Sequence, residues 1–186
     1  MSKKVFLKGT LILACTGLVS RIAGFFYRIF LSHAIGAEGL GLYQLILPLQ
    51  GLMAALSYTG IQSALSRLIA SRLALQEKKE AYFSLVTGIF AAVFFSAVTG
   101  FLLFRHADFF ASTILKAPGT SDLLRLTAAS IPLCAIHSCI DSYYYARKKA
   151  SVPAVVQLSE QSARIGTTYI LYLIFLSEGR PVTAMI

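Results

Sequence analysis

Charge is scarce in this chain of 186 residues, in which 13% of the side chains are charged and 56% are apolar. The mean hydropathy of +0.71 lies far above the value typical of a soluble domain. These values exclude a soluble enzyme core, and they identify a membrane protein.

Cysteines and catalytic motifs are also sparse. The three cysteines, Cys15, Cys134 and Cys139, all lie inside apolar runs, which argues against an extracellular disulfide framework. The sequence has no glycine-rich phosphate loop with a lysine, no nucleophile elbow and no paired histidines at helical spacing. We therefore expect neither an enzyme nor a bound cofactor.

Acidic residues are few: 8 Asp and Glu stand against 17 Lys and Arg, and the formal net charge is +9. In a soluble chain such an excess would suggest a nucleic-acid partner. Here the basic residues fall between long apolar runs, so they predict membrane topology, and no nucleic-acid partner is expected.

Long apolar runs, by contrast, are abundant. A transmembrane helix needs about 20 mainly apolar residues. The sequence therefore predicts an all-α fold, a polytopic bundle with five transmembrane helices at about residues 6–30, 43–72, 82–104, 122–145 and 152–176. The second run is longer than one crossing requires, and Pro48, Gly51 and the Thr59-Gly60 pair predict a kink or a break within it.

The segments around these runs carry signals for turns and helix ends. The glycine-rich stretch Ile35–Tyr43 predicts a tight turn. Ser121 or Asp122 is expected to cap the fourth helix, and Pro132 to bend it. Ser151-Val-Pro153, a hydroxyl followed by a first-turn proline, predicts the start of the fifth helix.

The basic residues also predict the orientation. With the N-terminus in the cytoplasm, ten of the 17 lie on the inner side: Lys3, Lys4, Lys8, Arg67, Arg72, Lys78, Lys79, Arg147, Lys148 and Lys149. The outer connections then hold four, which are Arg105, Lys116, Arg125 and Arg180. The positive-inside rule favours this arrangement. We expect a multi-pass protein of the cell membrane with a cytoplasmic N-terminus.

Both ends of the chain carry further signals. Ile12–Cys15 loosely resembles a lipoprotein cleavage site, but the apolar run continues well beyond it and four more runs follow, which favours a retained first helix. Residues 181–186 resemble the opening of a sixth helix. We therefore expect residues 1–186 to be the truncated first part of a longer membrane protein.

Two arginines fall inside the first apolar run. A cation near the bilayer centre costs about 2.5 to 3.5 kcal/mol on insertion scales, so such a residue indicates a functional site by default. Arg21 lies roughly 22 Å along the helix at 1.5 Å per residue, and Arg28 shares its face together with Gly17 and Gly24. For Arg28 two interpretations stay open: its side chain extends to the outer interface, or it faces the same cavity as Arg21. For Arg21 we favour a water-filled cavity.

The fifth run carries a polar stripe at spacings of three and four residues: Gln157, Glu160, Gln161, Arg164 and Thr168. One interpretation is a structural ion pair between Glu160 and Arg164 at the i, i+4 spacing. That pair leaves the glutamines and the threonine unexplained, so we favour a cavity wall. In the fourth run, Cys134, His137 and Asp141 share a face, but no fourth zinc ligand is near, and we expect no metal site.

Several segments resemble the stage V sporulation protein B family, in the polysaccharide-export branch of the MATE-like flippase superfamily: residues 6–10, Ser20–Gly24 with Arg28, Ile35–Tyr43 with Pro48, Ile131-Pro132, Tyr144–Lys149, Pro153-Ala154 and Gln157–Arg164. The resemblance implies a MATE- and MurJ-like transporter with two lobes around a cleft, of which this chain forms part of the N-terminal lobe. In the related lipid II flippases, arginines of the first helix are thought to engage the pyrophosphate of a lipid-linked sugar.

The resemblance and the intramembrane charges together predict a flippase for a lipid-linked oligosaccharide or peptidoglycan precursor, with membrane lipids and a coupling ion as further partners. The expected substrate-binding residues are Arg21, Arg28, Arg164, Glu160, Gln157 and Gln161. Arginine suits a diphosphate because its planar fork pairs with phosphate oxygens. Two alternatives stay open: an ion-coupled exporter of small cationic compounds, and a non-transporting scaffold for cell-wall or spore-cortex synthesis.

Overall fold

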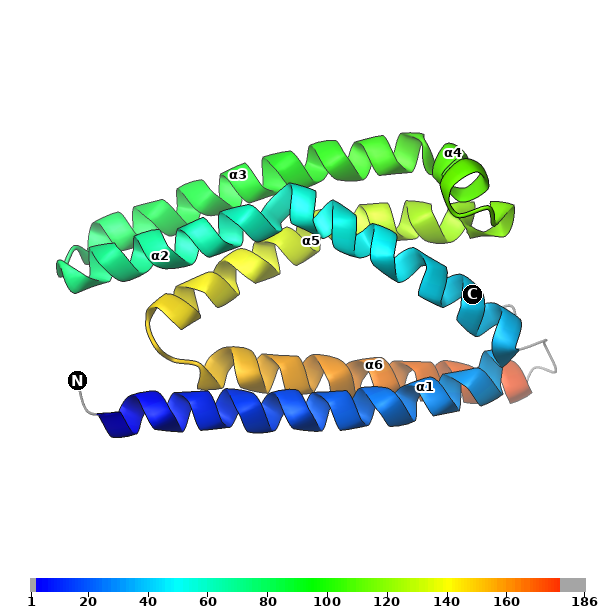
Figure 1. The fold of residues 1–186 in the computed structure, drawn as a ribbon, viewed down its shortest axis with the longest axis horizontal. Helices are drawn as coiled ribbons and strands as arrows, with labels where there is room; N and C mark the ends of the chain where they lie inside the picture. Colours follow the sequence, from blue (N-terminus) through cyan, green and yellow to red (C-terminus); the bar gives the residue numbers. More distant parts are fainter. Residues whose placement is uncertain (1–2, 178–186) are drawn as a thin grey trace. The chain divides into compact units, whose positions relative to one another are not determined.

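The computed structural model describes the backbone of residues 3–177 and the side chains of residues 11–177, and this part of the chain consists of helices joined by short turns (Figure 1). The elements are α1 (Lys3–Ala54), the π-helical turn η1 (Ala55–Thr59), α2 (Gly60–Ala74), α3 (Lys78–Arg105), α4 (Ala107–Phe109), the π-helical turn η2 (Phe110–Ile114), the 3-10 turn η3 (Pro118–Thr120), α5 (Ser121–Ala146) and α6 (Ser151–Ser177). The all-α fold class is confirmed.

Three segments of the described residues are long and apolar enough to cross a membrane: Leu11–Ala74, Lys78–Arg105 and Pro118–Ala146. The first has 64 residues, and a single crossing needs only about 20. Helix α6 has 27 residues but carries Glu160 and Arg164 near its middle, and it is not among the three. The protein is a helical membrane protein, while the count of five crossings stays a prediction. The sixth helix expected at residues 181–186 lies outside the described residues.

The chain forms two compact units. The first contains the residues up to Tyr43 and those from Lys148 onward, so α6 packs beside a segment more than a hundred residues earlier in the chain. Both helices run in the same direction (Figure 1). Their contacts confirm this direction, because later residues of α1 contact later residues of α6. Gly24 is next to Gln161, and the ring of Phe30 contacts that of Tyr172 at a centroid distance of 5.4 Å. Parallel packing is what two crossings in the same direction require.

Helix α1 breaks at one residue. Gly36 adopts φ 74° and ψ 176°, a conformation that favours glycine, and the residues on both sides of it are helical. The turn predicted over Ile35–Tyr43 is confirmed as a kink between two helical segments at Gly36, while the other glycines of the stretch keep helical geometry. Glycine permits a turn without requiring one, and the neighbouring leucines and alanine favour helix.

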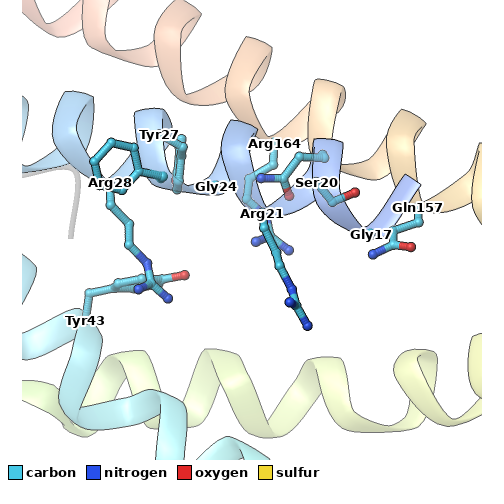
Figure 2. A pocket seen from close by; sticks show the side chains of 11 residues that line it. Gly17, Ser20, Arg21, Gly24, Tyr27, Arg28, Tyr43, Gln157 and Arg164 are labelled. Atoms are coloured by element: carbon cyan, nitrogen blue, oxygen red, sulfur yellow. The ribbon is translucent and has the colours of Figure 1, made fainter. Parts of the chain in front are cut away.

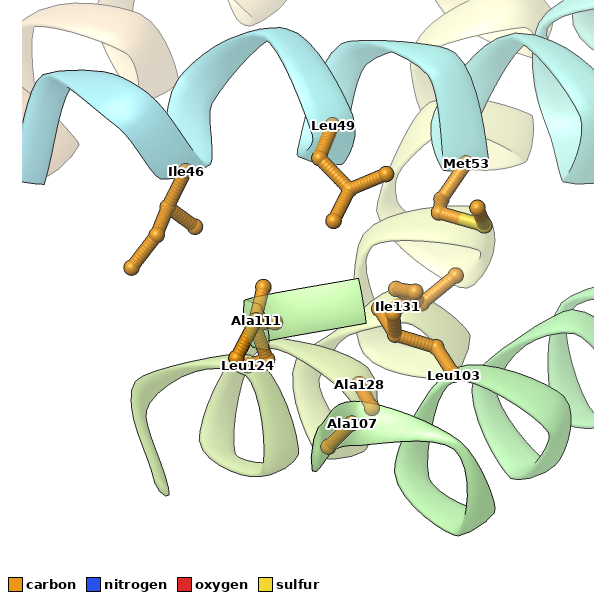
Figure 3. Close-up of a cluster of buried hydrophobic side chains, with 9 residues drawn as sticks. All are labelled: Ile46, Leu49, Met53, Leu103, Ala107, Ala111, Leu124, Ala128 and Ile131. Carbon is orange, nitrogen blue, oxygen red and sulfur yellow. The ribbon is translucent and has the colours of Figure 1, made fainter. Parts of the chain in front are cut away.

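The second unit, Gln44–Arg147, packs α2, α3 and α5 together. Two glycines sit where helices come close. A Cβ at Gly100 would lie 2.9 Å from the carbonyl oxygen of Ala128, and one at Gly88 would lie 2.7 Å from the Leu65 side chain. Figure 3 shows one of the two apolar clusters of this unit, which is made by Ile46, Leu49, Met53, Leu103, Ala107, Ala111, Leu124, Ala128 and Ile131.

Two bends predicted from proline and glycine have different outcomes. The break expected between Pro48 and Gly60 takes the form of the π-helical turn Ala55–Thr59, while Pro48 itself stays inside α1. Pro132 also lies inside a helix, and Figure 1 shows α5 bending near its middle. The start of α6 at Ser151 is confirmed.

The cap predicted for the fourth helix is wrong. Helix α5 begins at Ser121 with Thr120 as its N-cap residue, and no side chain makes a capping hydrogen bond there. The Thr120 hydroxyl instead donates to the carbonyl oxygen of Ala117 at 2.7 Å. The 3-10 turn Pro118–Thr120 leads directly into α5, so Ser121 is already helical.

The close approach at Gly100 gives a stability test. We expect Gly100→Ala to lower the stability of the full-length protein by about 1 to 3 kcal/mol relative to Gly51→Ala, because the added methyl group meets backbone that cannot rotate away. A Cβ at Gly51 meets no atom within 4 Å, so that variant is the matched control. Thermal unfolding in detergent measures both, and equal midpoints would contradict the packing described.

Candidate functional site

Two polar stripes face each other in the first unit. On α1, Gly17, Arg21, Gly24 and Arg28 recur at spacings of three and four residues, which places them on one face of the helix. On α6, Gln157, Gln161 and Arg164 recur at the same spacings and therefore also share one face. Together they line a pocket of about 550 Å³, whose lining residues are Gly17, Ser20, Arg21, Gly24, Phe25, Tyr27, Arg28, Tyr43, Gln157, Gln161 and Arg164.

The lining residues follow an order along the helices. Figure 2 shows Arg28 and Tyr43 at one end of the pocket and Gly17 and Gln157 at the other, while Arg21 lies between the two ends. Arg28 lies seven positions after Arg21, which is a rise of about 10 Å along an α-helix. The pocket therefore follows the helix axes and is longer than a single anionic group.

Glycine keeps this space open. A Cβ at Gly17 would meet no atom within 4 Å, so a larger side chain there would project into the pocket. A Cβ at Gly24 would lie 3.5 Å from Nε2 of Gln161, in ordinary van der Waals contact. Gly24 thus lets the amide of α6 reach the face of α1.

Tyrosine and phenylalanine side chains join α1 and α6 at the pocket wall and farther along the helices. The Thr168 hydroxyl donates to the Arg164 carbonyl oxygen at 2.9 Å, so its own oxygen is left to accept from the Tyr27 hydroxyl, 3.2 Å away. The Phe30 ring contacts both Tyr169 and Tyr172. These contacts fix the register of α6 against α1, and Thr168, the last residue of the predicted polar stripe, has a structural role.

The pocket is positively charged. Its lining includes three exposed arginines and no carboxylate. Two arginines outside the pocket do have acidic partners: Arg125 donates to Asp108 at 2.9 Å and to Asp122 at 3.0 Å, and Arg72 donates to Glu77 at 2.8 Å. A hollow with three cations and no lining carboxylate attracts an anion from outside the chain.

Five of the six predicted site residues line this one pocket: Arg21, Arg28, Arg164, Gln157 and Gln161. Glu160 is not among the lining residues, although it lies beside Gln161 in the sequence. For Arg28 the pocket is favoured over simple contact with the membrane interface, and for α6 a cavity wall is favoured over a purely structural stripe. Their binding of a substrate stays a prediction.

Sequence reasoning missed four lining residues, which are Ser20, Phe25, Tyr27 and Tyr43. Ser20 and Tyr27 could have been found, because both lie on the stripe of Arg21 and Arg28 at helical spacing. Tyr43 could not, since its place depends on the break at Gly36. Ser20 Oγ is buried and has no hydrogen-bond partner among the described residues.

The polar residues of α5 belong to the second unit and are not among the lining residues of this pocket. His137 Nε2 is 3.8 Å from Asp141 Oδ2, at the i, i+4 spacing. Within the described residues no group of three or more His, Cys, Asp and Glu side chains is placed to hold a metal ion.

The sequence matches a known protein family. Residues 6–186 match the model of the polysaccharide biosynthesis protein family, and the chain belongs to this family. It is similar to the stage V sporulation protein B of Bacillus subtilis (strain 168), with 33% identity over 184 residues. The match covers 96% of this chain and 35% of that relative, so the chain spans about a third of the relative's length. No solved structure gives a significant match.

The hydration of the pocket can be tested by thiol labelling. In a background where Cys15, Cys134 and Cys139 are serine, we expect a charged methanethiosulfonate to modify Gly17→Cys at least about tenfold faster than Val19→Cys, because the reactive thiolate forms in water. Val19 lies at nearly the same depth, among the exposed apolar residues of α1. Equal rates at the two positions would contradict a water-filled pocket.

Proposed function

We propose that the full-length protein is a membrane transporter that moves a lipid-linked sugar diphosphate from the cytoplasmic to the outer leaflet, and that the pocket between α1 and α6 binds its anionic headgroup. The observation that carries the proposal is the convergence of Arg21, Arg28 and Arg164 on one hollow with no carboxylate in its lining. Membership of the polysaccharide biosynthesis protein family supports it.

The chemistry of the substrate explains why such a pocket is needed. A diphosphate with attached sugars is too polar to cross hydrocarbon unaided, whereas its apolar lipid tail dissolves in the hydrocarbon. Guanidinium groups bind phosphate oxygens through charge-assisted hydrogen bonds, which are about twice as strong as neutral ones. The headgroup can therefore occupy the hydrated pocket while the tail stays in the bilayer.

The direction of transport follows from the proposed orientation. With the N-terminus in the cytoplasm, the connections rich in lysine and arginine, around Lys78 and around Arg147–Lys149, face the inner side. The pocket then lies on helices that run outward from the cytoplasm. Movement of this lobe against a second lobe would open the pocket to each side in turn, as in transporters built from paired bundles.

An exporter of small cationic compounds is the rival within membrane transport. Such a cargo needs acidic groups in the binding site, because opposite charges must meet in a medium of low dielectric constant. The lining of this pocket contains three cations and no carboxylate. The charge therefore favours an anionic cargo.

The main test is a single substitution in the full-length protein. We expect Arg21→Ala to reduce outward movement of a lipid-linked sugar diphosphate by about tenfold or more, because a charge-assisted hydrogen bond contributes about 1.5 to 3 kcal/mol. A flippase assay in proteoliposomes, with inserted protein quantified, measures the rate. Arg67→Ala removes an exposed arginine of α2 outside the pocket and should leave the rate unchanged. Undiminished movement with Arg21→Ala would count against the proposal.

The orientation has its own test. In intact cells, an impermeant thiol reagent should label Gly119→Cys, in the connection before α5, and should not label Lys149→Cys, in the connection before α6, until the membrane is opened. Both positions are exposed, and a Cβ at Gly119 meets no atom within 4 Å. Labelling of Lys149→Cys alone in intact cells would reverse the proposed topology.

A further inference from the structure

The pocket has two chemically different ends. Its middle and one end hold the guanidinium groups of Arg21, Arg164 and Arg28, with Tyr43 beside the last of these (Figure 2). Its other end, beside Gly17, is neutral and polar, and there Gln157 comes from α6. Gln161 lies next along α6, opposite Gly24. A pocket that bound a diphosphate alone would not need a neutral polar end beside its arginines.

The neutral end suits hydroxyl groups. An arginine only donates hydrogen bonds, whereas an amide both donates and accepts, and a serine hydroxyl does the same. Sugar hydroxyls also donate and accept. Gln157 at the Gly17 end, and Gln161 and Ser20 beside the arginines, therefore offer the partners that a sugar needs.

Ser20 adds an independent observation. Its Oγ is buried against the pocket wall, and it has no hydrogen-bond partner among the described residues. A buried polar atom without a partner is unfavourable by about 1 to 3 kcal/mol, and a group that pairs with Ser20 Oγ would remove this cost. The open space at Gly17, in the previous turn of α1, leaves room for such a ligand.

We propose that Gln157, Gln161 and Ser20 form a sugar subsite, which selects a lipid diphosphate that carries a sugar over the same lipid diphosphate without one. The inference rests on the proposed function, since the arginines must first hold the diphosphate. The first sugar of the headgroup then lies against the amides of α6, along the part of the pocket between Gly17 and Gly24. Specificity comes from neutral hydrogen bonds, while charge supplies most of the affinity.

The test compares two ligands on one protein. The full-length protein in phosphatidylcholine nanodiscs is titrated with a polyprenyl diphosphate, and separately with the same lipid bearing one N-acetylhexosamine, with binding followed by native mass spectrometry. We expect the wild type to prefer the sugar-bearing lipid. We expect Gln157→Ala with Gln161→Ala to lose about tenfold in affinity for that lipid alone, as two neutral hydrogen bonds would give.

A charge variant separates the two proposals. Arg21→Ala with Arg28→Ala should weaken both ligands by the same factor, and Ser162→Ala, an exposed α6 residue outside the lining, should change neither. If the wild type binds neither lipid diphosphate, the proposed function itself fails. If the wild type binds both ligands equally, or the glutamine variant weakens both equally, the sugar subsite is wrong while the anion pocket stands.

Discussion

An arginine inside a membrane needs water or an anion beside it, and the unit formed by α1 and α6 is built around that constraint. Arg21, Arg28 and Arg164 come from two helices far apart in the sequence, and they line one hollow. Neither helix could hold these cations in hydrocarbon by itself, because each charge would add an insertion penalty of about 2.5 to 3.5 kcal/mol. Parallel packing places the charges around one shared hollow.

Glycine serves opposite purposes in the two units. In the second unit Gly88 and Gly100 allow contact, because a Cβ at either would lie within 3 Å of a neighbour. In the first unit Gly17 maintains a gap, because no atom lies within 4 Å of the position that its Cβ would take. Close approach stabilises helix packing in a membrane, where the hydrophobic effect contributes little between helices. At Gly17 these packing contacts between helices are missing, and the space is left for a ligand.

Two arginines of the second unit differ from the pocket arginines in having acidic partners. Outside the pocket, Arg125 bridges Asp108 and Asp122, and Arg72 pairs with Glu77 near the turn between α2 and α3. Such pairs at a surface contribute about 0 to 1 kcal/mol, and they leave no charge available to a ligand. The pocket arginines face polar but uncharged neighbours. Their positive potential therefore remains available to an external anion, whereas the charges of Arg72 and Arg125 are paired within the chain.

The sequence by itself determined the membrane environment, the helical class and most of the pocket wall, because apolar length and helical spacing are local properties that tertiary packing does not alter. It placed Arg21, Arg28, Gln157, Gln161 and Arg164 on two stripes. Only the tertiary structure decided that these stripes meet, that Glu160 is not part of the lining, and that the helix resumes after Gly36 so that Tyr43 reaches the site. Contacts between distant segments depend on the packing of whole helices, and no local pattern records them.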